Sequence, residues 1–301
     1  MDSRMNAWTW SLLVLLGLIW GASFFFARIA VQHVPPLTLV FLRLLIAALA
    51  LHVYIAGRFD IYSILKARWR EFLILGLINN ALPHALIFFG QTRIGAGLAA
   101  ILNATTPIWT VLIANYFTSD EKLSSAKIAG CLVGLAGTIV LIGPGISAGG
   151  EAPLWALLLP VLAAISYGFA ATYGKRFKNV PAPVTAAGQL TASSLIALPL
   201  SLLWDRPWTL AAPPLDALFA ILALALLSTA FGYILYFRIM AAAGATNASL
   251  VTLLVPPSAI LLGVLFLGER LTSGEFAGMA LIGFGLVILD GRAYRLLAKT
   301  A

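Results

Sequence analysis

Long apolar runs constrain the fold of this chain more than any other feature. Ten of them lie near Trp8–Ala30, Pro36–Ala56, Glu71–Phe89, Gly97–Phe117, Lys127–Pro144, Pro153–Tyr173, Val184–Trp204, Leu218–Phe237, Ala248–Leu267 and Gly274–Leu289. A helix that crosses a bilayer needs about 20 mostly apolar residues. Lipid offers the backbone no hydrogen bonds, and the runs lack the alternating pattern of barrel strands, so each run must be helical. The sequence predicts an all-α membrane protein with ten transmembrane helices.

The composition agrees with a largely lipid solvent. Hydrophobic residues make up 61% of the chain and charged residues 10%, whereas a soluble domain has about 25% charged residues to cover its surface. The net charge of +8 does not indicate a nucleic-acid partner, because the basic residues occupy short gaps between apolar runs. Cys131 is the single cysteine, which excludes an intramolecular disulfide.

The distribution of Lys and Arg predicts the orientation of the chain in the membrane. Fourteen lie on the side that holds both termini: Arg4, Arg58, Lys66, Arg68, Arg70, Lys122, Lys127, Lys175, Arg176, Lys178, Arg238, Arg292, Arg295 and Lys299. Four lie on the other side: Arg28, Arg93, Arg206 and Arg270. Positively charged loops stay cytoplasmic, so we expect a protein of the inner cell membrane with both termini in the cytoplasm.

The second half of the sequence repeats the first at an offset of 147 to 149 positions. The matched pairs include Gly21 with Gly168, Pro36 with Pro183, Gly95-Ala96 with Gly244-Ala245, Pro107 with Pro256, and Glu121 with Glu269. We predict one repeat over 1–145, a linker over 146–152 and a second repeat over 153–301. Five runs per repeat is an odd number, so the second copy must enter the bilayer from the opposite side. Inverted repeats are typical of transporters, in which the two halves exchange conformations around a central cavity.

The repeated motifs resemble those of the EamA domain. Leu267-Gly268-Glu269-Arg270-Leu271-Thr272, followed by Gly278, Gly283 and Gly285, is similar to the end of that domain, and Leu18-Ile19-Trp20-Gly21 is similar to its start. The whole chain is identified as a two-EamA member of the drug/metabolite transporter superfamily, most like the YddG-type exporters of aromatic amino acids. The resemblance implies a ten-helix basket with a central cavity, peripheral fifth and tenth helices, and outward movement of metabolites.

Polar and aromatic side chains inside the runs are the candidates for a substrate site. Intramembrane polar groups usually face the bundle interior or a cavity, and Tyr or Trp offers a flat apolar surface with one hydrogen bond. The expected substrate-binding residues are Trp20, Ser23, Asn79, Asn80, His84, Asn103, Tyr167, Tyr233, Tyr236 and Thr252. Prolines at matched depths predict helix breaks or hinges at Pro83, Pro107, Pro256 and Pro257.

Two ionisable residues inside the runs leave alternatives open. His84 could shuttle protons, or it could be a neutral hydrogen-bonding group in the wall of the site, which we favour. Arg43 could counter a substrate carboxylate. The alternative that we favour is a cation that pairs with helix-end carbonyls or reaches toward an interface.

The acidic residues inform the mechanism, because all eleven lie at or beyond the ends of the runs. A proton-coupled exporter usually keeps a carboxylate at depth, so we expect secondary or facilitated export of neutral or zwitterionic metabolites, notably aromatic or hydrophobic amino acids. A proton-coupled exporter of many drugs and metabolites is the alternative within transport. An enzyme or channel is a distant one, because the three histidines are scattered and no metal-ligand spacing or P-loop is present. We expect no cofactor and no metal, and one monomer suffices for a pathway.

Overall fold

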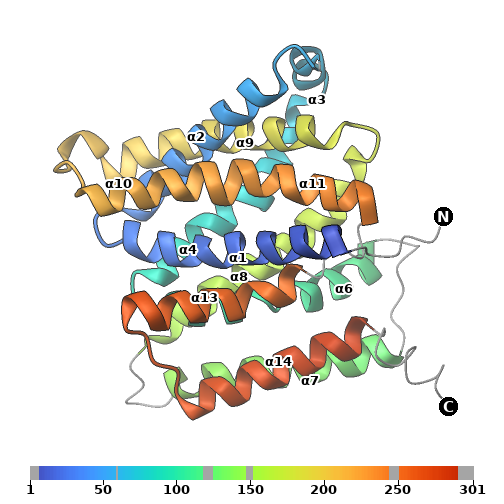
Figure 1. The fold of residues 1–301 in the computed structure, drawn as a ribbon, viewed down its shortest axis with the longest axis vertical. Coiled ribbons are helices and arrows are strands. Elements are labelled where there is room, and N and C mark those ends of the chain that lie inside the picture. The colour runs from blue at the N-terminus through green and yellow to red at the C-terminus, as the bar shows by residue number, and fades with distance from the viewer. Residues whose placement is uncertain (1–6, 59, 118–124, 147–151, 244–250, 291–301) are drawn as a thin grey trace.

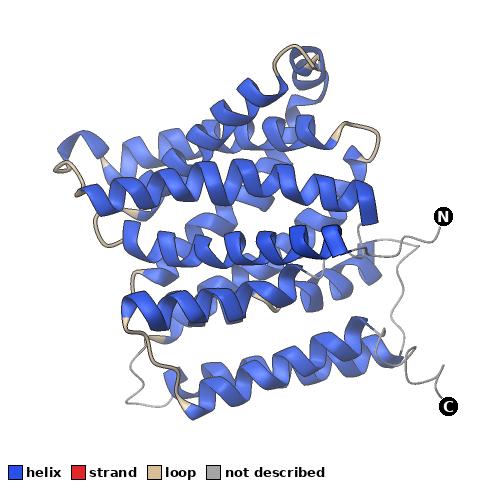
Figure 2. Cartoon of the chain, viewed as in Figure 1, coloured by secondary structure: helices blue, strands red, loops and turns tan. Residues whose placement is uncertain are grey.

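The computed structural model describes residues 7–58, 60–117, 125–146, 152–243 and 251–290. This part of the chain is helical and contains no strand (Figure 2). The first half holds α1 (Ala7–Ala30), α2 (Pro36–Ile55), α3 (Ile61–Gly76), η1 (Leu77–Ala81), α4 (Leu82–Gln91), α5 (Ala96–Asn103), α6 (Thr106–Phe117) and α7 (Ser125–Ile146). The second half holds α8 (Leu154–Gly174), η2 (Lys175–Phe177), α9 (Ala182–Leu200), η3 (Ser201–Asp205), η4 (Pro207–Thr209), α10 (Leu215–Leu222), η5 (Ala223–Phe231), α11 (Gly232–Ala243), α13 (Val251–Leu267) and α14 (Ser273–Asp290).

Several of these elements join end to end into helices long enough to cross a membrane. Seven such helices are described: Ala7–Ala30, Pro36–Ile55, Ile61–Gln91, Ala96–Phe117, Leu154–Phe177, Ala182–Asp205 and Leu215–Ile239. Three shorter apolar helical stretches coincide with the remaining predicted runs: Lys127–Val140, Leu254–Leu267 and Ser273–Ile288. Large apolar side chains such as Leu203 and Phe266 are exposed on the outside of this bundle, as a lipid solvent requires. The protein is a multi-pass membrane protein.

The third of these helices begins earlier than the sequence predicts. It starts at Ile61 rather than at Glu71, and the carboxylate of Asp60 accepts a hydrogen bond from the backbone N–H of Ser63 at its N-terminus. The added segment carries Lys66, Arg68 and Arg70, which lower its hydropathy. An apolar-run criterion therefore misses it.

The described residues include three π-helical segments, η1, η3 and η5, and two of them lie at related positions in the two halves. η1 continues α3 into α4, and η5 continues α10 into α11. The repeat offset of 147 to 149 residues places η1 inside η5. A π-helical turn shifts the backbone hydrogen bonds from i–4 to i–5 and is often found at functional sites.

The four prolines predicted as helix breaks or hinges lie in different settings. Pro107 is the second residue of α6, just after the break at Ala104 and Thr105 that separates α5 from α6, and Pro83 lies at the start of α4, after η1. Pro256 and Pro257, in contrast, lie inside helix α13, which continues through both, so no helix break occurs there. A hinge role for these prolines stays a prediction. The repeat-matched residues Glu121 and Gly244-Ala245, and 147–151 of the predicted linker, lie outside the described residues.

Helices from the two predicted repeats pack on one another in related pairs. α1 packs against α13 and α6 packs against α8, while α2 packs against α9. α7 and α14 pack mainly on each other and lie together at one end of the bundle (Figure 1). The N-terminal end of α1 and the C-terminal end of α14 lie on the same side of the molecule (Figure 1).

Glycines permit the closest of these approaches. A Cβ at Gly21 would lie 2.4 Å from Cβ of Ser258 in α13 and 2.8 Å from the carbonyl oxygen of Val255. A Cβ at the repeat-matched Gly168 would lie 2.9 Å from Cδ1 of Ile113 in α6. Small residues at such contacts let backbones meet without side chains between them.

Two carboxylates of the second half hold helix N-termini of the first half, on the face away from the chain termini. Asp205 accepts hydrogen bonds from the backbone N–H (2.6 Å) and Oγ1 (2.9 Å) of Thr38 in α2. Glu269 accepts from the backbone N–H groups of Ala96 (2.6 Å) and Gly97 (3.1 Å) in α5. Both satisfy backbone donors that a helix start leaves free, and both place negative charge at the positive end of the helix dipole.

We expect Gly21→Ala to destabilise the protein by about 1–3 kcal/mol, because the added methyl overpacks the contact between α1 and α13. Gly174→Ala is the matched control, since a Cβ at Gly174 meets nothing within 4 Å. Thermal unfolding of the purified proteins in detergent measures the difference. Equal melting temperatures for the two variants would contradict the close contact.

Candidate functional site

Arg43 lies in the middle of α2 and is buried inside the bundle. The residue is 8% exposed, and its Nε donates a hydrogen bond of 2.9 Å to Oγ1 of Thr229 in η5. Its guanidinium carbon also lies 5.8 Å from the ring centroid of Phe88. A charged side chain at mid-membrane costs about 3 kcal/mol on biological insertion scales, so such a residue usually has a functional role.

The π-helical turn in η5 prepares Thr229 for this contact. Its hydroxyl donates to the carbonyl of Leu224, five residues earlier, at 2.8 Å, which leaves the oxygen lone pairs free to accept from Arg43. η1 offers a carbonyl in the same manner, because Oγ of Ser166 in α8 donates to the carbonyl of Ile78 at 2.7 Å. η1 and η5 thus each accept a side-chain hydrogen bond from a residue of the other half.

Polar side chains of η1 connect to the second half. Nδ2 of Asn79 donates to Oε1 of Gln189 in α9 at 2.8 Å. The hydroxyl of Tyr233 in α11 donates to Oδ1 of Asn80 at 3.3 Å. Asn80 is fully buried, and its Nδ2 has no hydrogen-bond partner among the described residues. A buried amide donor without a partner is costly, which points to a position that a ligand or water completes.

His84 and Tyr167 complete this group around the guanidinium. Both interact electrostatically with Arg43. The ring of His84 stacks on Phe88 at 6.1 Å between centroids, and its Nδ1 is buried without a hydrogen-bond partner in the described part of the chain. We call Arg43, Asn79, Asn80, His84, Tyr167, Gln189, Thr229 and Tyr233 the central polar cluster.

An aromatic chain extends from the central polar cluster. The ring of Tyr233 stacks on Phe237 at 5.8 Å, and Phe237 meets Tyr236 edge-on at 5.8 Å. Tyr236 then stacks on Trp20 of α1 at 5.5 Å. Gly232 permits this arrangement, since a Cβ there would lie 2.6 Å from Nε1 of Trp20. The result is an apolar wall that begins at the polar cluster and ends at α1.

The structure brings together five of the predicted site residues, Asn79, Asn80, His84, Tyr167 and Tyr233, and places Trp20 and Tyr236 in the adjoining aromatic chain. The other three lie apart. Oγ of Ser23 donates to the carbonyl of Trp20 in its own helix at 2.7 Å. Asn103 ends α5, and its buried Oδ1 has no partner among the described residues. Thr252 lies partly buried in the first turn of α13.

Three cluster residues were not among the predicted substrate-binding residues: Arg43, Gln189 and Thr229. The favoured alternative for Arg43, pairing with helix-end carbonyls or reaching toward an interface, is wrong, because its side chain ends at Thr229 and Phe88 in the interior. A signal existed for all three, since each is a polar residue in the middle of an apolar run. Only the packing of α2 on α9 and η5 brings them to one place.

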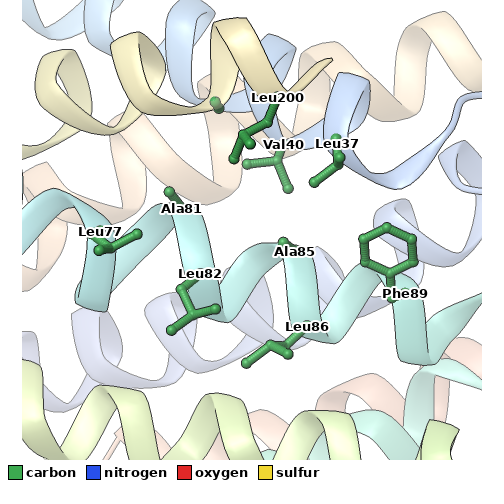
Figure 3. A pocket seen from close by; sticks show the side chains of 10 residues that line it. Leu37, Val40, Leu77, Ala81, Leu82, Ala85, Leu86, Phe89 and Leu200 are labelled. Carbon is green, nitrogen blue, oxygen red and sulfur yellow. The ribbon is translucent and has the colours of Figure 1, made fainter. Parts of the chain in front are cut away.

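The central cavity expected from the sequence is not open in this conformation. Arg43, Asn80, His84, Gln189 and Thr229 are buried against one another and their neighbours. A hollow of about 280 Å³ lies away from this cluster, between α2, η1, α4 and α9. Figure 3 shows that apolar side chains line it: Leu37, Val40, Leu77, Ala81, Leu82, Ala85, Leu86, Phe89, Ala197 and Leu200. Such a lining offers no polar contact to a metabolite.

Within the described ranges, no group of three His, Cys, Asp or Glu side chains is arranged to hold a metal ion. Glu71 lies within α3 and pairs with Arg68, and the other described carboxylates lie at helix ends. The members of the central polar cluster are therefore uncharged apart from Arg43 and the titratable His84. This arrangement suits reversible recognition of a polar solute.

The sequence profile of the EamA-like transporter family matches residues 7–143 and again 154–289. The chain belongs to the EamA-like transporter family. It is therefore a transporter and not an enzyme.

Individual relatives agree with this assignment. The chain is 26% identical to the uncharacterized transporter YoaV of Bacillus subtilis, over 91% of this chain and 94% of that protein. It is 28% identical to the uncharacterized inner membrane transporter YedA of Escherichia coli K12, over 95% and 92%. It is 25% identical to a protein of the same strain named a probable amino-acid metabolite efflux pump, over 92% and 93%. A solved crystal structure with 23% identity superposes with a TM-score of 0.67, covering 97% of this chain and 99% of that one, which shows that the two share a fold.

We expect Asn79 and Gln189 to couple across the interface of the two halves of this EamA-like transporter. A double-mutant cycle with Asn79→Ala and Gln189→Ala should give an interaction energy of about 0.6–1.7 kcal/mol, the range measured for side-chain hydrogen bonds between membrane helices. Unfolding in mixed micelles provides the measurement. Additive effects of the two substitutions would contradict the hydrogen bond.

Proposed function

We propose that this transporter exports small neutral or zwitterionic metabolites, in particular aromatic or hydrophobic amino acids, through the central polar cluster. The observation that carries the proposal is the origin of that cluster. α2 and η1 with α4 supply Arg43, Asn79, Asn80 and His84 from the first half, and α8, α9, η5 and α11 supply Tyr167, Gln189, Thr229 and Tyr233 from the second. A site divided between two halves changes its access when the halves move against each other.

We infer that the ten predicted helices all cross the membrane and that the second repeat is inverted relative to the first. Support comes from the related packing of α1 on α13 and α8 on α6, and from the matching π segments η1 and η5. The excess of Lys and Arg on the side of the termini favours a cytoplasmic location for both ends. One copy of the chain contains every helix that the pathway needs.

The chemistry of the site favours amino-acid-like cargo over cationic drugs. The central polar cluster consists of amide, hydroxyl and imidazole groups and one cation, Arg43. None of its members is a carboxylate. The aromatic chain from Tyr233 to Trp20 provides the flat surface that a ring or branched side chain needs. A relative that is named a probable amino-acid metabolite efflux pump agrees with this choice. Without a buried carboxylate to carry a proton, transport is facilitated or weakly coupled.

We expect purified protein in proteoliposomes to move phenylalanine and leucine with saturable, trans-stimulated flux. Trp20→Ala, Asn80→Ala and Tyr233→Ala should each lower this flux about five- to thirtyfold, because truncated anchors of a binding site cost more than about 1 kcal/mol each. Trp204→Ala and Tyr116→Ala are matched controls, since these side chains are 79% and 83% exposed on the outside of the bundle. Full flux in all three site variants would remove the central polar cluster as the site.

The same mechanism requires a gate on the face away from the termini, and Glu269 is suited to hold it. Its carboxylate ties the loop after α13 to the N-terminus of α5. A helix cap of this kind contributes about 0.5–2 kcal/mol. Loss of the charge should therefore let this face open more often.

We expect Glu269→Gln to raise by roughly three- to tenfold the rate at which an impermeant maleimide labels a cysteine at position 23, in a Cys131→Ser background. Ser23 lies in α1 between Trp20 and this face. Glu275→Gln is the control, because Glu275 caps its own helix by accepting from the backbone N–H of Thr272. Equal labelling in the Glu269 and Glu275 variants would contradict the gate.

A further inference from the structure

Arg43 is a buried cation whose charge the described protein does not balance. The residue is 8% exposed, and its guanidinium bonds the neutral hydroxyl of Thr229. The described carboxylates have other partners, as in the contacts of Asp205 with Thr38, Glu269 with Ala96 and Glu71 with Arg68. No described carboxylate pairs with Arg43. A buried charge without a counter-charge is strongly unfavourable, and a negatively charged ligand would supply the group that the described residues lack.

A buried donor of the central polar cluster also lacks an acceptor. Nδ2 of Asn80 is buried without a hydrogen-bond partner among the described residues. The hydroxyl of Tyr233 already donates to Oδ1 of the same side chain, so the amide is held in place with its Nδ2 unused. A ligand that completes this arrangement must therefore accept hydrogen bonds and carry negative charge.

We propose that Arg43 binds the carboxylate of the cargo and makes a carboxylate the essential feature of every good substrate. This inference rests on the proposed function, because it names the substrate class of the same central polar cluster. A carboxylate is planar and matches the guanidinium fork with two parallel hydrogen bonds. A hydrogen bond from the unpartnered Nδ2 of Asn80 would add to the pair.

The aromatic chain determines where the rest of such a molecule lies. Tyr233 belongs to both parts of the site, since its hydroxyl bonds Asn80 and its ring stacks on Phe237. From there the rings of Phe237, Tyr236 and Trp20 follow one another. A carboxylate at Arg43 would therefore place an apolar or aromatic side chain along this wall.

The amino group of an amino acid has no charged partner in this arrangement. Neutral oxygen atoms would accept its hydrogen bonds, and the amino group would contribute little to the binding affinity. The site should thus bind deaminated acids as well as it binds amino acids, and it should discriminate against amides and amines that lack the carboxylate. This order of preference is the opposite of that of an exporter of organic cations.

The test compares matched ligands on the purified full chain by thermal unfolding. Each set contains an amino acid, its amide and its deaminated acid: L-phenylalanine, L-phenylalaninamide and 3-phenylpropionate, with the corresponding leucine set. We expect both acids of a set to stabilise the protein and the amide to need at least about tenfold higher concentration, as loss of a charged hydrogen-bonded pair predicts. Equal stabilisation by the amide, or none by any carboxylate, would overturn the proposal without the need for a variant.

Substitutions then assign the effect to Arg43. Arg43→Met should abolish the preference for acids over amides, and Arg43→Lys should retain part of it, because the charge remains while the planar fork is lost. Arg58→Met is the matched control, since Arg58 is exposed beside Tyr54 and should leave the preference unchanged. An unchanged preference in Arg43→Met would overturn the assignment.

Flux measurements separate this inference from the proposed function. Equal transport of phenylalanine and phenylalaninamide by the wild-type protein would leave export intact and refute the carboxylate anchor. Carboxylate-selective stabilisation without flux of any acid would leave the anchor intact and refute amino-acid export.

Discussion

The inability of lipid to hydrogen-bond is the constraint on which the rest of this structure depends. Every backbone group in the hydrocarbon must be satisfied within the protein, so the apolar runs become helices. Polar side chains are driven to the interior for the same reason. In this protein they meet at one place, where Arg43, Asn80, Gln189 and Thr229 are buried between the two halves. The cost of burying these groups is offset by the contacts they make across that interface.

Departures from regular α-helix occur where those contacts need them. η1 and η5 lie beside the central polar cluster, and in each a carbonyl accepts a hydrogen bond from a side-chain hydroxyl. In η5 this bond fixes the hydroxyl of Thr229 as an acceptor for Arg43. The π segments therefore link the backbone geometry directly to the chemistry of the site.

Movement between the halves depends on contacts that are close but separable. Gly21 and Gly168 let α1 and α8 approach α13 and α6 without interlocking side chains. At the face away from the termini, Asp205 and Glu269 add charged helix caps between the halves. A cap of this kind stabilises a helix end by so little free energy that thermal motion can break the contact. The combination is consistent with a transporter that closes around its cargo and releases it.

The sequence by itself determined the membrane class, the helical content and the positions of the helices, because hydropathy over about 20 residues depends on local composition. It also gave the internal repeat and most of the polar candidates, including Asn79, Asn80, His84 and Tyr233. It missed the charged start of the third helix at Ile61, since Lys66 and Arg70 hide this first segment, which a kink at Arg68 separates from the apolar part, from an apolar-run criterion. It also assigned helix breaks to Pro256 and Pro257, although α13 continues through both.

Only the tertiary structure decided which polar side chains share a site. Arg43 and Thr229 are 186 positions apart, and Asn79 and Gln189 are 110 apart. Helical periodicity relates residues within one helix, and it says nothing about which face of a second helix will meet them. The packing of α2 on α9 and η5 turned an arginine that looked peripheral into the centre of the site. Ser23, by contrast, was a candidate by sequence, but its hydroxyl bonds a carbonyl of its own helix.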